Sequence, residues 1–187
     1  MTKKLLLLLS LFLAPYVLIA ADMSKDDDLN KSKTVAINLK KTLGGLLKQK
    51  LQTDGPAGAL VFCSDSAMPL TKRIAEENEA VVRRVSFKNR NSLNLPDELD
   101  SKALNEYAKY KNEAEAPKYL VLKDEKTGGS RYYEPMYVVG MCLVCHGDTA
   151  KMSEAVKSEL AKKYPNDKAV GYNAGDFRGL IVVELKK

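Results

Sequence analysis

Two cysteines and the only histidine of the chain are arranged as C-x-x-C-H, at Cys142, Cys145 and His146. Thiols at this spacing can add to the two vinyl groups of one haem, and a histidine directly after them can coordinate the iron. The chain has three cysteines and one histidine in total, so this short stretch holds two of the cysteines and the histidine. The motif therefore predicts one covalently attached haem c, with thioether bonds at Cys142 and Cys145 and His146 as the proximal ligand.

Two other kinds of site can be built from the same residues. A C-x-x-C pair can act as a thiol-disulfide couple, but that motif normally opens a helix in a β-α-β unit, and no such alternation precedes residue 142. A zinc site would add Cys63 to the two motif cysteines and His146, yet adjacent ligands at 145 and 146 suit tetrahedral closure poorly. Haem attachment is the favoured interpretation, and a thiol-disulfide oxidoreductase using Cys142 and Cys145 is an alternative.

The first 21 residues have the pattern of a secretory signal peptide. Met1–Lys4 is basic, residues 5–21 are almost wholly apolar, and the stretch ends in Ala20 and Ala21. We expect cleavage near this point and a periplasmic location, whereas an uncleaved leader would anchor the chain to a membrane. The polar residues 22–32 predict a mobile N-terminal lead-in, and residues 33–187 predict a single domain.

The third cysteine, Cys63, needs an explanation in an exported protein, because an oxidising compartment seldom leaves a thiol unpaired. Asp54 and Pro56 predict the start of a helix on which Cys63 shares an apolar stripe with Leu60 and Ala67. A buried free cysteine most often acts as a small apolar residue. It could also bind the haem iron as a thiolate on the distal side. Spacing alone leaves both roles open.

The single histidine also limits the distal side of the haem, since two histidines of one chain cannot hold the iron. The distal position then belongs to Cys63, to a methionine, or to no protein ligand. The methionines considered are Met68, Met136, Met141 and Met152. Met141 lies too close to the attachment point to reach around it easily. A thiolate favours Fe(III) and lowers the reduction potential, whereas a methionine raises it.

Charge and motifs argue against several classes of function. The formal charge of +6 comes from basic residues interleaved with acidic ones, so no nucleic-acid-binding surface is predicted. The sequence has no G-x-S-x-G element, no phosphate-binding loop and no second histidine for a triad. We therefore expect a protein that is not an enzyme, and a membrane contact only through an uncleaved leader.

Hydrophobic periodicity predicts an α+β domain in which helices come first. A helix over 34–51 is interrupted at Gly44 and Gly45, and a second helix is kinked at Pro69. Later elements are a strand at 81–87, a helix from Pro96 or Asp97, a hairpin of strands 118–123 and 131–139, a helix at 153–164 and a strand at 179–185. The first helix could pack on its own domain or pair with a second copy, so a homodimer through the N-terminal helices stays open.

Longer stretches of the sequence carry a resemblance to a known family. They are RVSFKNRNSLNLPDE, YYEPMYV, MCLVCHG and KYPNDKAVGYNAGDFRGLIVVE, together with the earlier helical cysteine. From about Lys33 to Glu184 the chain resembles the exported haem-c domains with a PAS-like fold, which occur alone or as the sensing part of signalling receptors. The resemblance implies a five-stranded antiparallel sheet flanked by helices and one covalent haem. It also implies that the helical cysteine, which matches Cys63, can be the second axial ligand, opposite His146.

Arginines near the matching segment are candidates for contacts with the haem propionates. The Arg-Asn segment of the family matches Arg90 and Asn91 here, although Ser92 stands where the family often has proline. Arg84 and Arg90 are the candidates, because a guanidinium group binds a carboxylate through two parallel hydrogen bonds. An exposed surface charge is the plain alternative for each of them.

These features predict a periplasmic monohaem protein that acts in redox sensing or electron transfer. A haem-based sensor or binding module for NO or CO, in which a gas replaces the distal ligand, is the alternative that a PAS-like fold suggests by analogy. Either role needs a redox or signalling partner protein, and the sequence does not identify it.

Overall fold

The computed structural model describes residues 14–186. The first 13 residues of the predicted signal peptide lie outside this range. The α-helices are α1 (Ala14–Thr53), α2 (Gly55–Glu77), α3 (Glu98–Tyr107), α4 (Leu143–His146) and α5 (Glu154–Lys163). The strands are β1 (Ala80–Val85), β2 (Leu120–Lys123), β3 (Ser130–Tyr137) and β4 (Phe177–Leu185), and the short 3-10 turns are η1 (Ser92–Asn94), η2 (Gly140–Cys142) and η3 (Thr149–Lys151).

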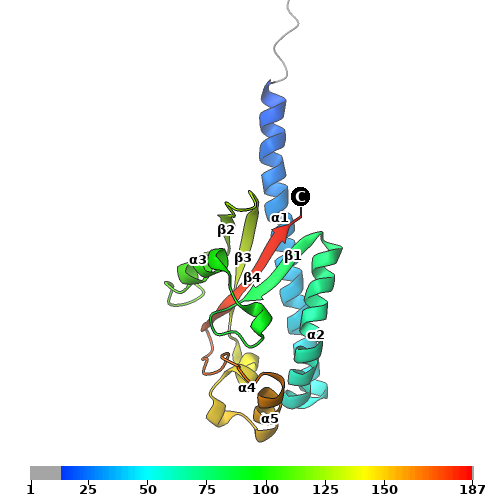
Figure 1. Cartoon of the computed structure of the whole chain (residues 1–187), viewed down its shortest axis with the longest axis vertical. Coiled ribbons are helices and arrows are strands. Elements are labelled where there is room, and N and C mark those ends of the chain that lie inside the picture. The colour runs from blue at the N-terminus through cyan, green and yellow to red at the C-terminus, as the bar shows by residue number, and fades with distance from the viewer. Residues whose placement is uncertain (1–13, 187) are drawn as a thin grey trace, which may run out of the picture.

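The strands form one antiparallel sheet in the order β1-β4-β3-β2. The last strand of the chain therefore lies in the middle, where Val183 pairs with Val82 of β1 on one side and with Tyr132 of β3 on the other. Figure 1 shows the sheet with helices around it and α4 and α5 beyond one end of it. The predicted α+β class, with an antiparallel sheet flanked by helices, is confirmed.

The family resemblance implies five strands, but the sheet has four within residues 14–186. The segment that follows β1 forms turns and η1 instead of another strand. Its backbone bonds locally: Ser86 N–H donates to Asn94 O, and Asn91 caps η1 by accepting from Leu93 N–H. Asparagine side chains that hydrogen-bond the nearby backbone in this way favour a turn over a further β-strand.

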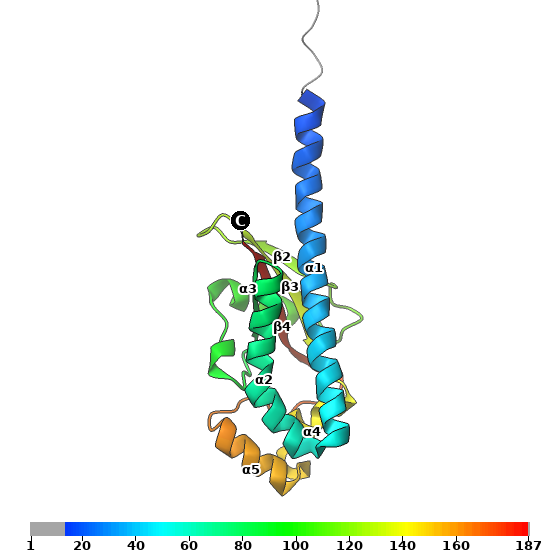
Figure 2. The same cartoon turned by 90° about the vertical axis from the view of Figure 1, so that its right-hand side faces the viewer.

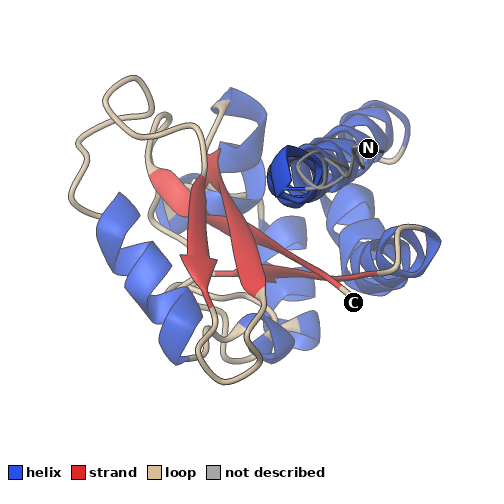
Figure 3. Cartoon of the chain, turned by 90° about the horizontal axis from the view of Figure 1, so that it is seen from above, coloured by secondary structure: helices blue, strands red, loops and turns tan. Residues whose placement is uncertain are grey.

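The two faces of the sheet bury different helices, which explains why β4 is apolar from Leu180 to Val183. Ile181 and Val183 face α1 and α2, where they pack with Leu39. Leu180 and Val182 face the opposite way, where they pack with residues of α3 such as Leu104. Successive side chains of a strand point to opposite faces, so a central strand covered on both faces has no polar side. Figure 3 shows α3 on one side of the strands and the paired α1 and α2 on the other.

Helix α1 begins much earlier than the sequence pattern predicts. The polar segment 22–32, expected as an irregular lead-in, belongs to the helix. No glycine or proline occurs between Tyr16 and Leu43, and the apolar face already contacts the domain from Leu29 onward, so the helix continues without a break. Figures 1 and 2 show its N-terminal part projecting past the end of the sheet. Within the described residues, no helix combines the length and apolar character needed to cross a membrane.

Neither predicted interruption ends a helix. Gly44 and Gly45 lie inside α1, and α2 continues through Pro69. A proline removes one intrahelical hydrogen bond. Here Ala67 and Thr71, on either side of Pro69, are buried, so tertiary packing holds the helix together. The predicted break at Asp54 is confirmed, because Gly55 there has a φ of +69° and reverses the chain.

The packing of α1 resolves one alternative that the sequence left open. Val35, Ala36 and Leu39 are buried against the chain's own sheet and α2. Lys40 adds a polar link, because its ammonium group pairs with Glu134 of β3 and donates to Pro135 O. The apolar face of α1 over these turns is therefore covered within one chain. The homodimer remains a prediction for the projecting part of the helix.

Candidate functional site

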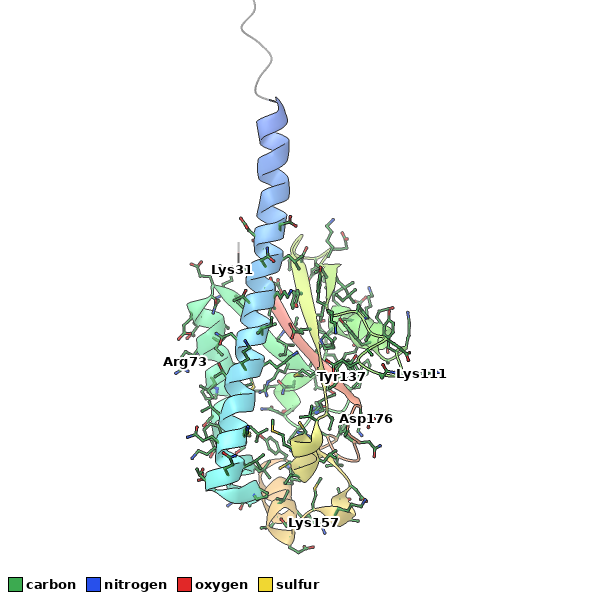
Figure 4. All side chains as sticks on the ribbon, turned by 180° about the vertical axis from the view of Figure 1, so that it is seen from behind. Lys31, Arg73, Lys111, Tyr137, Lys157 and Asp176 are labelled. Atoms are coloured by element: carbon green, nitrogen blue, oxygen red, sulfur yellow. The ribbon has the colours of Figure 1, made fainter. Side chains whose placement is uncertain are left out.

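The C-x-x-C-H motif lies where the chain leaves β3, at the end of the sheet opposite the projecting part of α1 (Figure 1). Figure 4 shows Tyr137 and Asp176 at this end of the sheet, next to the motif turn. Val138 N–H donates to Asp176 O, and Cys142 N–H donates to Val139 O, which turns the strand directly into η2. The motif is therefore attached to two adjacent central strands.

One helical turn presents the two motif cysteines. Cys142 ends η2, and Cys145 lies within α4, so the two are three residues apart on continuous helical backbone. Residues at this spacing lie on the same side of a helix. Cys145 packs against the cluster of Leu60, Met152, Val156 and Leu160, and Cys142 packs against Val138, Ala169 and Tyr172. Both thiols are free and partly buried, as covalent attachment to a flat apolar group requires.

Gly147 closes the motif by bringing a distant segment against it. Its N–H donates to Leu143 O, while its own carbonyl accepts from Gly171 N–H at 2.8 Å. The next bond in register joins Tyr172 N–H to His146 O at 3.0 Å. A β-carbon on Gly147 would lie 2.6 Å from Leu143 O, a backbone atom that cannot swing aside. The position directly after the histidine therefore needs a residue without a side chain.

We predict that Gly147→Ala loosens this turn and lowers the yield of haem-loaded protein. The clash with Leu143 O should separate residues 146–147 from residues 171–172, at a cost of about 1–3 kcal/mol in the free energy of unfolding. Thermal unfolding and the ratio of haem to protein measure the two effects. Gly140→Ala is the matched control, because a β-carbon there meets nothing within 4 Å. Equal behaviour of the two variants would contradict the role given to Gly147.

His146 is held in one orientation and one tautomer. Its Nδ1 lies 2.7 Å from Ala169 O, and since a carbonyl can only accept, Nδ1 carries the proton and donates. Nε2 therefore keeps its lone pair and is the atom available to a metal. Burial lowers the pKa of His146 to about 3, and the positive charges of Arg90 and Arg178 contribute further. The ring is neutral at physiological pH.

This pKa predicts an acid-sensitive fold for the chain produced without haem. The unfolded chain takes up a proton near pH 6.5, whereas the folded chain does so only near pH 3, so the unfolded state binds more protons between these values. Stability is then lost as the pH falls through this window, by up to about 1.4 kcal/mol per pH unit. His146 is the only histidine, so urea unfolding of His146→Asn between pH 5 and 7 should lack this slope. An identical slope in both proteins would contradict the assignment.

Cys63 faces the motif from α2. Burial is the main cause that raises the pKa of its thiol, against the nearby positive charges of Arg84 and Arg90. A negative charge on Cys63 would in turn raise the pKa of Cys145, which places the two thiols in one electrostatic neighbourhood. The third cysteine is therefore a neutral, half-buried thiol beside the C-x-x-C-H motif.

The other predicted ligand sets are less well supported by the geometry. No group of three or more histidine, cysteine, aspartate or glutamate side chains in residues 14–186 is arranged to hold a metal ion, so the four-ligand zinc site finds no support there. Met136 packs with the α1 face of the sheet, and Met152 is buried among Leu60, Val156 and Leu160. Met68, whose sulfur is 3.8 Å from a guanidinium nitrogen of Arg84, is the methionine that shares the surroundings of Cys63.

Arg84 is half-buried and lacks a strong partner. Its Nη2 donates to the Met68 sulfur, and its buried Nε–H has no hydrogen-bond partner among the described residues. Burial lowers the pKa of this guanidinium, and the positive charge of Arg178 also lowers it. An unpartnered buried donor is costly, so this nitrogen indicates that an acceptor belongs here.

Arg90, the second predicted propionate contact, is already bonded within the chain. Its Nε donates to Asp167 Oδ2 at 3.0 Å. Its Nη2 donates to Cys145 O at 2.5 Å and to Ala169 O at 3.2 Å. Two of its three nitrogens thus bind the motif and the segment that supports it. Arg90 is first of all a link between these two segments.

Arg178 joins the site without having been predicted. Its Nη1 donates to Lys88 O, and its guanidinium lies 5.4 Å from the ring centre of Tyr172. Burial lowers its pKa, as it does for Arg84. Arg84, Arg90 and Arg178 together bring three positive charges to the motif, and the carboxylate of Asp167 bonds Arg90. The site therefore suits a ligand with negative groups.

A hollow of about 390 Å³ opens beside these residues. Ser64 of α2, Arg90 and Tyr164 are among the residues that line it. It borders the motif through the hydrogen bond from Arg90 to Cys145 O, although His146 does not line it. The hollow therefore lies where α2 meets the segment after α5, beside the motif and not within it.

The comparisons with known proteins agree with this geometry. The sequence matches the family described as Tll0287-like over residues 19–185. The chain belongs to the Tll0287-like family. A solved structure described as the crystal structure of the cyanobacterial haem protein Tll0287 aligns with a TM-score of 0.68 and 27% sequence identity, covering 86% of this chain and 96% of that chain. A search of curated proteins found no match. The family expected from the sequence is confirmed.

Within this Tll0287-like chain the structure brings together most of the predicted site residues. Cys63, Arg84, Arg90 and Cys145 influence one another electrostatically, and His146 lies within the field of Arg90. The sequence analysis missed Arg178, Asp167 and the carbonyl of Ala169. Asp167 and Ala169 lie in the stretch KYPNDKAVGYNAGD, whose family resemblance was the one available signal. Nothing in the sequence itself indicated that this stretch returns to the motif.

Proposed function

We propose that the chain binds one haem c covalently and works as an exported one-electron redox protein. Cys142 and Cys145 form the thioether bonds, His146 Nε2 is the proximal ligand, and Cys63 is the distal ligand. The haem supplies a one-electron change between Fe(III) and Fe(II). The chain's own residues fix the ligand atoms, exclude water from the proximal side and balance the charge of the cofactor.

The observation that carries this proposal is the state of His146. Its Nδ1–H is tied to Ala169 O, so the ring presents a free Nε2 directly after two thiols on one helical turn. Metal-ligating histidines almost always donate their other ring N–H to a carbonyl or a carboxylate in this way. A histidine that only filled space in the core would not need two adjacent thiols.

The charge of the site gives independent support. Haem carries two propionates, and the site holds three guanidinium groups, of which Arg90 has a carboxylate partner in Asp167. The unpartnered Nε of Arg84 suits a propionate oxygen, and Arg178 is the second candidate. Two carboxylates would leave these positive charges close to balanced in a half-buried site.

Cys63 is preferred over the methionines as distal ligand because of its surroundings. Arg84 and Arg90 act on its thiol, and its charge acts on Cys145. Met136 and Met152 are committed to apolar packing. Thiolate ligation would also protect the single unpaired cysteine from oxidation.

For a sensing role, a structural change at the site could reach α1 through β3, because the two elements are linked by side-chain contacts. β3 leads directly into the motif, and the side chain of Glu134 on β3 accepts from Tyr132 and pairs with Lys40 of α1. A change at the haem that moves the end of β3 would therefore bear on α1, whose N-terminal part projects past the sheet. A partner protein reading α1, or a second copy pairing through it, would receive the signal.

Carbon monoxide titration of the dithionite-reduced protein tests the redox function against gas binding. A carrier with a firmly held distal ligand should show no spectral change with CO, and its iron should titrate as one n = 1 wave in potentiometry. Tight CO binding by the unmodified protein would favour the gas-sensing alternative. Free thiols at both Cys142 and Cys145 after denaturation would favour the thiol oxidoreductase.

A further inference from the structure

Arg90, Asp167, Ala169 and the motif form a closed ring of hydrogen bonds. Arg90 Nε donates to Asp167 Oδ2 at 3.0 Å, and Asp167 Oδ1 accepts from Ala169 N–H at 2.8 Å. Arg90 Nη2 then reaches Ala169 O at 3.2 Å and Cys145 O at 2.5 Å. The ion pair is nearly buried, since both side chains are 10% exposed. A pair this buried persists only when further hydrogen bonds satisfy it, and here each partner makes at least one to the backbone.

The carbonyl of Ala169 connects this ring to the histidine. It accepts from His146 Nδ1 at 2.7 Å and from Arg90 Nη2 at 3.2 Å. One oxygen therefore serves both the predicted proximal ligand and the guanidinium. Arg90 also holds Cys145 O, the carbonyl of the residue just before His146. The arginine thus fixes the histidine from two directions, through its own backbone and through its hydrogen-bond acceptor.

We propose that Arg90 is a positioning residue for His146, which fixes the ring orientation and limits how strongly the ring donates electrons to a bound metal. This inference rests on the proposed haem function. A carbonyl shared with a guanidinium accepts less strongly from Nδ1–H, so the imidazole gains less negative character. Arg90 thereby acts on the iron through His146, besides any contact with a propionate. Its bonds to Cys145 O in the motif and to Ala169 O beside it set this role.

Three variants separate position from charge. Arg90→Lys keeps the positive charge but loses the guanidinium nitrogen that bonds both Ala169 O and Cys145 O. Arg90→Gln loses both the positive charge and the hydrogen bonds of the guanidinium. Arg178→Gln is the control, because it removes a nearby positive charge while Arg90 keeps its bonds to the motif. Asp167→Asn is a fourth, milder variant, since an asparagine side chain can still accept from Ala169 N–H and from Arg90.

The first measurement is amide hydrogen exchange at Gly171 and Tyr172 in each protein as purified, with or without haem. These amides bond Gly147 O and His146 O, so they report the attachment of the motif. Arg90→Lys should speed exchange at both amides about tenfold. Arg178→Gln loses its contact with the Tyr172 ring, so it serves as the control at Gly171, where it should leave the exchange unchanged. Amide exchange does not depend on haem, so it tests whether Arg90 holds the motif in place even if the proposed function fails.

The second measurement is the haem itself, by potentiometry and electron paramagnetic resonance. At a fixed ambient potential, Arg90→Lys should lower the ratio of reduced to oxidised protein about tenfold, because His146 becomes a stronger electron donor. The electron paramagnetic resonance signals should broaden, because the ring of His146 is held less firmly. Arg178→Gln should change the ratio without broadening. If Arg90→Lys matches the unmodified protein in amide exchange rates, reduction potential and g-values, Arg90 contributes only its positive charge to the site and the inference is wrong. If Arg90→Lys and Arg90→Gln do not fold, Asp167→Asn must show the same changes in smaller degree, and a silent Asp167→Asn overturns the inference.

Discussion

Replacing Cys63 by alanine is expected to raise the reduction potential of the haem and to change the spin state of the oxidised iron. Loss of a thiolate removes the negative charge that stabilises Fe(III), so the potential should rise by on the order of 0.2 V, within the range over which axial ligands set haem potentials. Without a sixth ligand, oxidised iron should shift from low spin toward high spin. Visible spectra, electron paramagnetic resonance and potentiometry on the purified variant measure these changes.

The same variant should open the iron to CO, while its fold stays intact. Cys63 is partly exposed on α2, so its removal should cost much less than truncation of a fully buried leucine. Met68→Leu is the matched control, since Met68 lies on the same helix and shares the neighbourhood of Arg84. A spectrum of Cys63→Ala identical to that of the unmodified protein would remove Cys63 as ligand. A changed Met68→Leu spectrum would then point to the methionine.

Arg84→Met is expected to have opposite effects in the haem-free and haem-loaded proteins. Without haem the guanidinium Nε is buried and unpartnered, so an apolar side chain of similar length should stabilise the fold by about 1–3 kcal/mol. With haem the same change should destabilise the protein by a similar amount, because a propionate loses its partner. Urea unfolding of both forms measures the two free energies.

Arg83 is the control, since it is the neighbouring arginine on β1 and has a carboxylate partner. Its guanidinium bonds both oxygens of the fully buried Asp100. Arg83→Met should therefore destabilise both forms of the protein. If Arg84→Met also destabilises the haem-free protein, the buried guanidinium has a partner without haem and its assignment to a propionate is wrong.

Local signals in the sequence predicted most of the elements. The break between α1 and α2 followed from Asp54, Gly55 and Pro56, and the start of α3 followed from Asp97, whose side chain accepts from Asp100 N–H. The hairpin of β2 and β3 followed from the glycines at 128 and 129. These features are determined by residues close in sequence, where capping and turn chemistry act directly.

The errors arose where tertiary packing overrides local preference. Residues 22–32 look like a polar lead-in, yet they continue a helix that is buried further along. The glycine pair 44–45 looks like a break, but α1 continues through it and is held by contacts with α2 and the sheet. Propensity is a weak predictor at such positions because burial contributes more free energy than one lost hydrogen bond.

The proposed ligand residues of the candidate site could be predicted from the sequence. The residues that hold these ligands in place could not. The motif and Cys63 are visible in the sequence, because their side-chain chemistry is unusual. Ala169 acts through a backbone carbonyl that any residue could supply, and it reaches His146 across 23 positions of the chain. Arg90 was predicted as a propionate contact from its residue type. Its bonds to Cys145 O and Ala169 O depend on a fold that brings three segments together.

The most direct test of the central claim is the absorption spectrum of the protein purified from the periplasm, oxidised and dithionite-reduced, with a pyridine haemochrome assay on the same sample. We expect one haem per chain that stays with the protein under denaturing conditions, as thioether bonds at Cys142 and Cys145 require. The oxidised bands should be those of iron bound to a thiolate and a histidine. A colourless protein from a host able to attach haem would contradict the account, and so would haem that is lost on denaturation.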